Sequence, residues 1–158
     1  MGSELITTWS EHDGSLQRIL SLATTTLFVF DEDLSKLKLE RLEHADALHR
    51  FLLSDKRNRL QIAVKNSEPL RRHCPRLMKL LAVYGQNMSV VECPQHVLSL
   101  NDSLLIADEK HALIRFHKDS ARSKLILDSA GECKPYANRF EDILKEGGQP
   151  VCTSTLGL

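Results

Sequence analysis

The residues best suited to chemistry lie in the stretch 108–122, where acidic, basic and imidazole side chains follow one another closely. The segment R-F-H-K-D-S-A-R places Arg115 and His117 two positions apart, and such residues project from the same face of a strand. Together with Arg122 they predict a cradle for a phosphate or carboxylate, because a guanidinium presents its donors in a fixed fork. His111 extends this predicted anion site, and Asp108 is expected to order its cations.

The alternative for the same segment is a solvated or salt-bridged strand end. In that arrangement Arg115 pairs with Asp108 or Asp119 and binds no ligand. Surface charge pairs are common and contribute little free energy, so this interpretation is the favoured one.

A second basic cluster lies in R-R-H-C-P-R. Arg72 and Arg76 are spaced i, i+4 and share one face of a predicted helix. Cations in the first turns of a helix are unfavourable beside the macrodipole, which suggests a bound anion or a carboxylate partner such as Asp31 or Asp33. An internal ion-pair network is the favoured alternative.

Metal and cofactor chemistry have little support in the sequence. None of the seven histidines forms an H-E-x-x-H or similar motif, and none of the four cysteines forms a C-x-x-C pair. We therefore predict no metal site and no cofactor. The cysteines are expected to be reduced and mostly buried.

The stretch N-D-S-L-L-I-A-D, from Asn101 to Asp108, is followed by E-K-H-A-L-I-R-F. This layout resembles the H-x-K-x-x-x-x-D signature of the phospholipase D superfamily, which lies on a strand followed by a turn and a second strand. In that superfamily the His is the nucleophile and the Lys holds the phosphate. Here Asn101 and Ser103 occupy those positions and only Asp108 matches, so the resemblance implies a fold without the reacting groups.

Hydrophobic periodicity predicts alternating strands and helices over most of the chain. Strands are expected at 25–30, 59–65, 88–93, 103–107, 112–116 and 124–127, and helices at 15–23, 35–53, from N-S-E-P to Gly85, and 136–145. Repeated βα units imply parallel strands, and the short link at 108–111 implies an antiparallel hairpin. The predicted fold is therefore α/β, with a mixed sheet between helices.

This order is also that of one half of a phospholipase D superfamily protein, over about residues 25–147. We predict an N-terminal extension with a short helix over 1–24, a phospholipase D-like α/β domain over 25–148 and a C-terminal tail over 149–158. The resemblance also implies a homodimer, because active single-half members pair around their two signatures.

A closer resemblance is carried by F-D-E-D-L-S, R-H-C-P-R-L-M-K-L-L, R-F-H-K-D and the terminal T-L-G-L. These segments resemble an uncharacterised proteobacterial family whose members are sometimes fused to, or labelled as, GNAT acetyltransferases. A GNAT domain binds the coenzyme A pyrophosphate with a glycine-containing loop at a helix N-terminus. This sequence has no such loop, so acetyl transfer is not expected of it.

Composition narrows the function classes further. The 21 basic and 21 acidic residues give a formal net charge of zero, which disfavours binding to nucleic acid or to an anionic membrane. The N-terminus resembles no secretory leader, and no apolar run approaches the roughly 18 residues that span a bilayer. We therefore expect a cytoplasmic protein.

These observations predict a non-catalytic phospholipase D-like domain that binds a small anion or a protein partner. One alternative is a phosphodiesterase or nuclease that uses His111 or His117 as a displaced nucleophile. It requires one imidazole to face a pocket beside a base and a cation donor. A second alternative is an accessory domain of a GNAT acetyltransferase.

Overall fold

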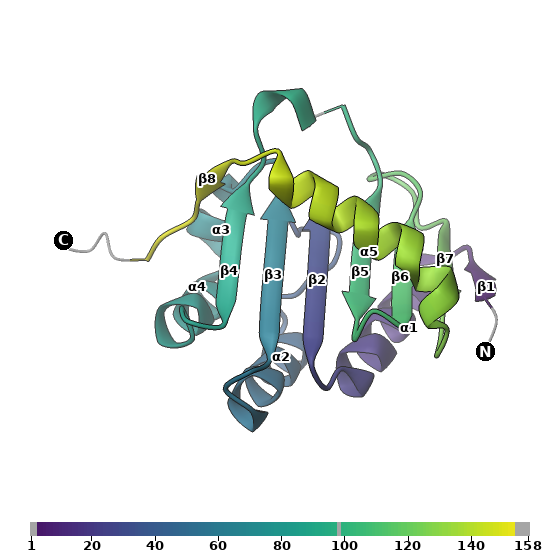
Figure 1. Cartoon of the computed structure of the whole chain (residues 1–158), viewed down its shortest axis with the longest axis horizontal. Coiled ribbons are helices and arrows are strands. Elements are labelled where there is room, and N and C mark those ends of the chain that lie inside the picture. Colours follow the sequence, from purple (N-terminus) through teal and green to yellow (C-terminus); the bar gives the residue numbers. More distant parts are fainter. Residues whose placement is uncertain (1–2, 98, 154–158) are drawn as a thin grey trace.

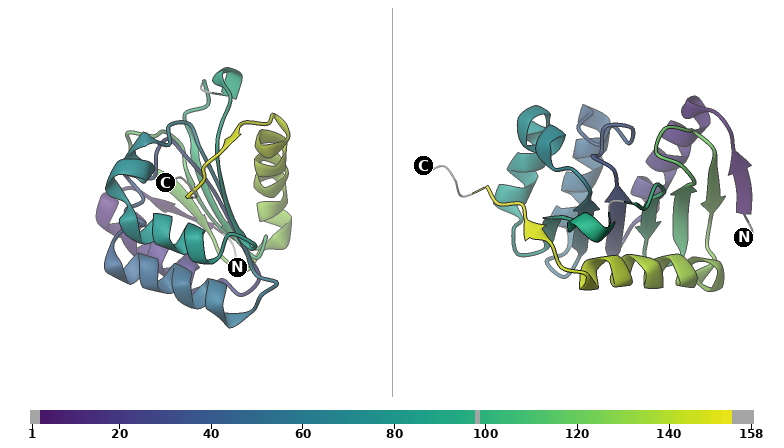
Figure 2. Two further views of the ribbon diagram at one scale, coloured as in Figure 1. Left: turned by 90° about the vertical axis from the view of Figure 1, so that its left-hand side faces the viewer. Right: turned by 90° about the horizontal axis from the view of Figure 1, so that it is seen from above.

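The computed structural model describes residues 3–97 and 99–153. Its elements, in chain order, are β1 (Ser3–Ile6), α1 (Trp9–Leu22), β2 (Thr26–Asp31), α2 (Leu42–Ser54), β3 (Arg59–Val64), α3 (Glu68–His73), α4 (Pro75–Val83), β4 (Met88–Glu92), η1 (Gln95–Val97), β5 (Ser103–Ala107), β6 (His111–Arg115), β7 (Ser123–Ile126), α5 (Ala130–Lys145) and β8 (Gln149–Pro150). The strands form one eight-stranded sheet in the order β1-β7-β6-β5-β2-β3-β4-β8. Helices α1 to α4 cover one face and α5 covers the other (Figures 1 and 2).

The sheet is mixed, as predicted. β2, β3 and β4 are parallel neighbours, whereas β5, β6, β7 and both edge strands pair antiparallel. The carboxyl ends of β2, β3, β4 and β6 therefore lie at one edge of the sheet, the upper edge in Figure 1, together with the start of β5. The predicted α/β class is confirmed.

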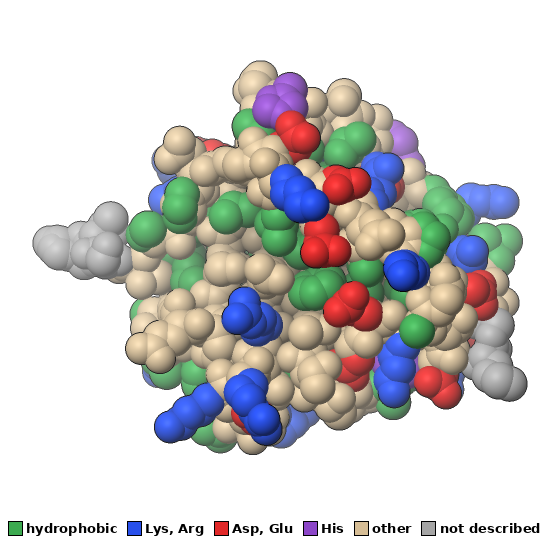
Figure 3. Space-filling view, in the orientation of Figure 1, with side chains coloured by type: hydrophobic (Ala, Val, Ile, Leu, Met, Phe, Trp, Pro, Cys, Tyr) green, Lys and Arg blue, Asp and Glu red, His purple; other side chains and the backbone are tan. Residues whose placement is uncertain are grey.

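Two apolar cores flank the sheet. The core under α1, α2 and α4 is the larger and includes Leu16, Ile19, Leu48 and Ile62. The core under α5 includes Phe28 and Phe140, whose rings stack with centroids 5.0 Å apart. Figure 3 shows the outer face over α5, where acidic and basic side chains both occur.

The N-terminal segment is part of the layered domain. β1 pairs with β7, and α1 packs Leu16 and Ile19 into the core as completely buried side chains. The helix begins at Trp9, earlier than predicted, because Thr8 caps it and Glu11 completes a capping box. The boundary placed at residue 24 therefore does not separate an extension from the domain.

Two predicted helices have different bounds. Residues 35–41 form turns, so α2 begins only at Leu42. Leu34, directly before this segment, and Lys38 within it have φ of 72° and 54°, which a helix does not allow. The helix predicted to end at Gly85 is broken into α3 and α4 at Cys74, which precedes Pro75. A proline disfavours helical backbone in the residue before it.

The cysteines carry free thiols: Cys93 and Cys133 are buried, Cys74 is partly buried and Cys152 is exposed. The terminal T-L-G-L lies outside the described residues. Within residues 3–97 and 99–153, no helix has the length and apolar character needed to cross a bilayer.

Candidate anion-binding site

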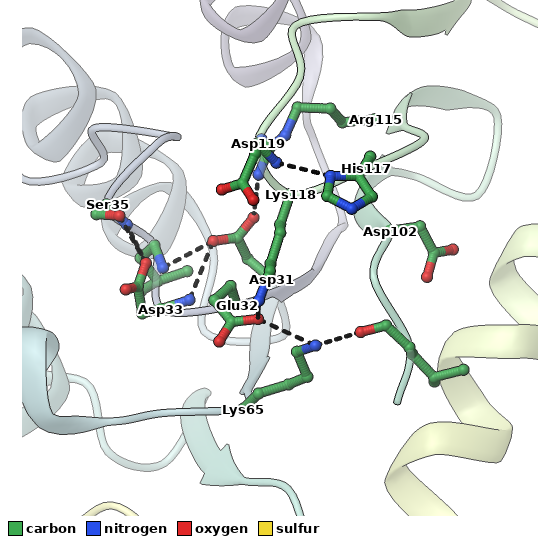
Figure 4. A network of polar contacts seen from close by, with 12 residues as sticks. Asp31, Glu32, Asp33, Ser35, Lys65, Asp102, Arg115, His117, Lys118 and Asp119 are labelled. Atoms are coloured by element: carbon green, nitrogen blue, oxygen red, sulfur yellow. Dashed lines mark hydrogen bonds and ion pairs between the residues drawn. The ribbon is translucent and has the colours of Figure 1, made fainter. Parts of the chain in front are cut away.

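The start of β5 adjoins a buried ion pair. Ser103 pairs in antiparallel register with Arg115 on β6, so their side chains share a face of the sheet. Leu104 pairs with Phe30, which places Ser103 one position further, beside Asp31. Arg115 Nη2 lies 2.9 Å from Asp31 Oδ1, and the two side chains are 1% and 0% exposed. Figure 4 shows this pair within the polar network at the upper edge of the sheet.

Asp108 lies at the opposite ends of these strands, directly after β5. Asp108 accepts hydrogen bonds from the backbone N–H groups of Thr24, Thr25 and Thr26 at 2.7–3.1 Å, and from two of their hydroxyls. Burial alone raises the pKa of Asp108, but these backbone and hydroxyl donors outweigh it and leave the pKa lowered. Asp108 therefore fixes the entry to β2 and does not order Arg115.

The five residues of the predicted anion site are dispersed. Arg115 is buried against Asp31, which was not among its expected partners, while His117 and Arg122 are exposed in the β6–β7 connection. His111 lies at the same edge as Asp108, is 7% exposed, and its Nδ1 accepts a hydrogen bond from the Asp128 N–H at 2.9 Å. These side chains do not converge on one site, because β6 separates His111 from Arg115 by its full length.

The second basic cluster is divided between two helices. Arg72 lies 3.5 Å from Glu68 within α3, whereas Arg76 in α4 lies 3.8 Å from Glu40. Both Glu40 oxygens also accept backbone N–H groups at the start of α4, from Arg76 and Leu77. The carboxylate partners are thus Glu68 and Glu40, in place of Asp31 or Asp33.

The upper edge carries further ion pairs that fix the surrounding loops (Figure 4). Glu32 Oε1 lies 3.0 Å from Lys65 Nζ and 3.6 Å from Lys118 Nζ. Lys65 also donates to the Leu100 carbonyl, and Asp102 pairs with Arg139 of α5 at 2.7 Å. These contacts hold Leu100 and Asp102 at this end of the sheet.

The side chains that do converge surround a cavity of about 400 Å³ beside the start of α1. We call it the Trp9 cavity; its lining residues are Trp9, Ser10, His12, Asp13, Lys36, Lys38 and Arg41. Three of these residues are cationic and one is a carboxylate, so the local charge is positive. This volume lies in the range of small-molecule sites.

The cationic wall is built by the turns between β2 and α2. Leu34, Leu37 and Leu39 are almost completely buried and anchor the segment, while Lys36 and Lys38 between them are exposed. The Lys38 carbonyl accepts a hydrogen bond from His44 Nδ1 at 2.7 Å. The alternation thus holds both lysines on the cavity side of the turns.

His12 forms the buried part of the cavity. It is 2% exposed, and its Nε2 is buried without a hydrogen-bond partner among the described residues. Burial, and next the charge of Arg115, lower its pKa to about 4, against the opposing effects of Asp31 and Asp13. The imidazole is therefore neutral at pH 7.

Trp9 joins the cavity to the buried ion pair. Its ring centroid lies 5.5 Å from both Lys36 Nζ and Arg115 Cζ, and the His12 ring meets it edge-on. The side chain remains 40% exposed. Two guanidinium nitrogens of Arg115, Nε and Nη1, are also buried, and no hydrogen-bond partner for them occurs in the part of the chain that the structure describes.

Sequence reasoning missed this cavity. Its members lie in two segments, 9–13 and 36–41, and the first was assigned to an extension. The alternation L-S-K-L-K-L, with leucines at 34, 37 and 39, was the available signal for an anchored basic turn. Among the described residues, no three His, Cys, Asp or Glu side chains are grouped to hold a metal ion.

The layered architecture makes the chain a phospholipase D-like α/β domain. Solved structures with this fold include Nuc from Salmonella typhimurium, a phospholipase D family member (12% identity, TM-score 0.62, covering 95% of this chain and 99% of that one). NucT from Helicobacter pylori is similar at 10% identity and TM-score 0.59, with 94% and 98% covered. At these identities the likeness shows the fold alone.

A third similar structure is TrmBL2, described as an archaeal chromatin protein with a novel mode of DNA binding (8% identity, TM-score 0.68). The match covers 94% of this chain but only 54% of TrmBL2. No curated protein sequence matches the chain. Residues 9–150 match the family described as Domain of unknown function (DUF7931), and the chain belongs to that family.

Proposed function

We propose that this protein is a non-catalytic phospholipase D-like domain that binds a small anionic molecule in the Trp9 cavity. The observation that carries the proposal is the composition of that cavity. Lys36, Lys38 and Arg41 line it against the single carboxylate of Asp13, and the buried His12 offers an unpartnered nitrogen. Cations around a partly enclosed space attract an anion more strongly than the same charges spread over a surface.

The rest of the surface supports this location. The chain has a formal net charge of zero, and the face over α5 carries side chains of both signs (Figure 3). An excess of positive charge at the cavity is therefore a local feature. Arg41 is itself only loosely held, since its Nη1 lies 3.4 Å from Asp13 and its side chain is 42% exposed.

Two observations support a non-catalytic role. At the signature position, Ser103 adjoins the buried Arg115–Asp31 pair, which leaves that cation engaged with an internal carboxylate. The proposed displaced nucleophiles are also poorly placed: His111 is buried with its Nδ1 accepting a backbone N–H, and His117 is exposed to solvent. Neither lines the Trp9 cavity.

Calorimetric titration with inorganic phosphate and pyrophosphate tests the proposal. We expect binding that weakens about tenfold or more in Lys36→Ala/Lys38→Ala, because two charge-assisted contacts are lost. The matched control is Lys56→Ala/Lys134→Ala, which removes the same charge from exposed positions outside the cavity. Equal weakening in both double variants would show a diffuse charge effect and overturn the site.

The competing function is a phosphodiesterase or nuclease. Hydrolysis of bis(p-nitrophenyl) phosphate and of single-stranded DNA, measured with and without divalent cations, separates it from simple binding. We expect no turnover above that of a His111→Gln/His117→Gln double variant. Homodimer formation and association with a GNAT acetyltransferase are further proposals from the sequence resemblance, and light scattering of the purified protein tests the first.

A further inference from the structure

We infer that the ligand of the Trp9 cavity is a phosphomonoester carrying an aromatic ring, of which a nucleoside monophosphate is the simplest example. This inference rests on the proposed function and deepens it. The cations of the cavity would bind the phosphate, and the Trp9 indole would stack on the ring. A bare oxyanion would leave the 40% exposed indole without a role in recognition.

Three side chains contact the indole, and their contacts differ in rigidity. Arg115 is fixed 5.5 Å from the Trp9 ring centroid by its buried pair with Asp31, and the His12 ring edge packs at 5.4 Å and 73°. Lys36 lies at the same 5.5 Å but belongs to an exposed side chain. The rigid contacts fix the indole plane, whereas the lysine contact is free to exchange.

The exchange is favourable in magnitude. A solvent-exposed cation–π contact contributes less free energy than the stacking of a base on an aromatic side chain. An aromatic ring that takes the place of Lys36 over Trp9 therefore gains more than it displaces. The released ammonium joins Lys38 and Arg41, where it neutralises the phosphate.

The cavity also favours a monoester over a polymer. Its volume is about 400 Å³, and its walls belong to one helix and one set of turns. A bound polynucleotide needs a basic track that follows several phosphates, and a chain of zero net charge is poorly suited to it. A terminal dianionic phosphate suits three converging cations better.

Trp9 is the only tryptophan of the chain, so its fluorescence reports the site directly. The experiment titrates wild type with adenosine 5′-monophosphate, ribose 5-phosphate and a short oligothymidylate. We expect the mononucleotide to quench the fluorescence and to bind about tenfold more tightly than ribose 5-phosphate, from the stacking contribution. The Trp9→Leu substitution should abolish that difference in affinity, measured by calorimetry, while ribose 5-phosphate still binds.

Trp9→Tyr retains an aromatic face and should restore most of the mononucleotide preference, which separates stacking from a folding defect in Trp9→Leu. Equal affinity for both phosphates, with unchanged fluorescence, would overturn this inference and leave the proposed anion site standing. Failure of both phosphates to bind would overturn the two together. Tighter binding of the oligothymidylate would overturn the monoester in favour of a polymer.

Discussion

Asp31 and Arg115 form an ion pair with an Nη2–Oδ1 distance of 2.9 Å, and neither side chain is more than 1% exposed. Asp31 also accepts the backbone N–H of Leu34 at 2.8 Å, at the start of the turns that carry the cavity lysines. One carboxylate thus connects the end of β2 with the indole beneath Arg115 and with the basic wall. The pair is structural support for the Trp9 cavity.

Removing Arg115 alone should be strongly destabilising. Arg115→Met leaves Asp31 buried without a cation, and the expected loss is about 3–5 kcal/mol in the free energy of unfolding measured in urea. Asp31→Asn/Arg115→Met should recover part of it, because no buried charge remains. Arg122→Met, at an exposed arginine nearby in sequence, serves as the control and should stay within about 0.5 kcal/mol of wild type. Equal effects of the two single variants would contradict a structural role.

Acid should weaken the fold through His12 before it affects carboxylates. The folded pKa is about 4, below the ordinary value of 6.5, so the unfolded chain binds a proton that the folded chain does not. Stability is then complete above pH 6.5 and falls by something on the order of 3 kcal/mol as the pH drops towards 4. In His12→Gln this slope should be absent, and a slope identical to that of wild type would refute the assignment.

Asp108 should act in a lower pH window. Its folded pKa is lowered from 3.8, so its contribution is present above that value and is lost as the pH falls through the folded pKa. Asp108→Asn replaces one of the two accepting oxygens with a donor, which at the Oδ2 position faces the Thr24 N–H, and should cost about 1–3 kcal/mol at pH 7. The difference in the free energy of unfolding between Asp108→Asn and wild type, measured in urea, should disappear at acid pH. The exposed Asp46→Asn is the comparison and should show no such convergence.

Alanine substitution of two glycines should change the stability of the protein in opposite directions. Gly148 has φ of 135°, and an added Cβ would lie 2.4 Å from the Glu92 carbonyl oxygen, so Gly148→Ala should lower the melting temperature. Gly14 lies within α1 with nothing within 4 Å of an added Cβ. Gly14→Ala should stabilise the protein by about 0.5–1 kcal/mol through helix propensity. A stable Gly148→Ala would show that β8 is not held as described.

The sequence predicted the strands well because each is a short apolar run bounded by turn residues. Helix bounds differ most where the backbone conformation departs from residue preference, as at Leu34 and Lys38, which adopt left-handed conformations without glycine. β1 was missed because Ser3–Ile6 has only one buried side chain. Periodicity carries no signal for such an edge strand.

The site was harder to predict for a physical reason. The motif at 101–122 predicted an anion site because its charged residues are close in sequence. A strand, however, places its first and last residues at opposite ends of the sheet. Asp108 and Arg115 therefore lie at opposite ends of the strands. Trp9 and Lys36 are 27 positions apart in sequence, yet the Lys36 Nζ lies 5.5 Å from the Trp9 ring centroid. Only the packing of α1 on the sheet, which no local pattern encodes, creates the cavity.

The pairing of β1 with β7 has a consequence for the order of events during synthesis. Ile6 pairs with Ser123, and Ser3 with Ile126, so the first strand has no partner until most of the chain has been made. α1 likewise rests on β5 and β6, which are translated long after it. Contacts between residues so far apart in sequence slow folding, and the N-terminal segments stay unpaired until their partners are synthesised. The helix that carries Trp9 is thus expected to pack late in folding, and a ligand that binds there would stabilise the domain only after β5 and β6 have formed.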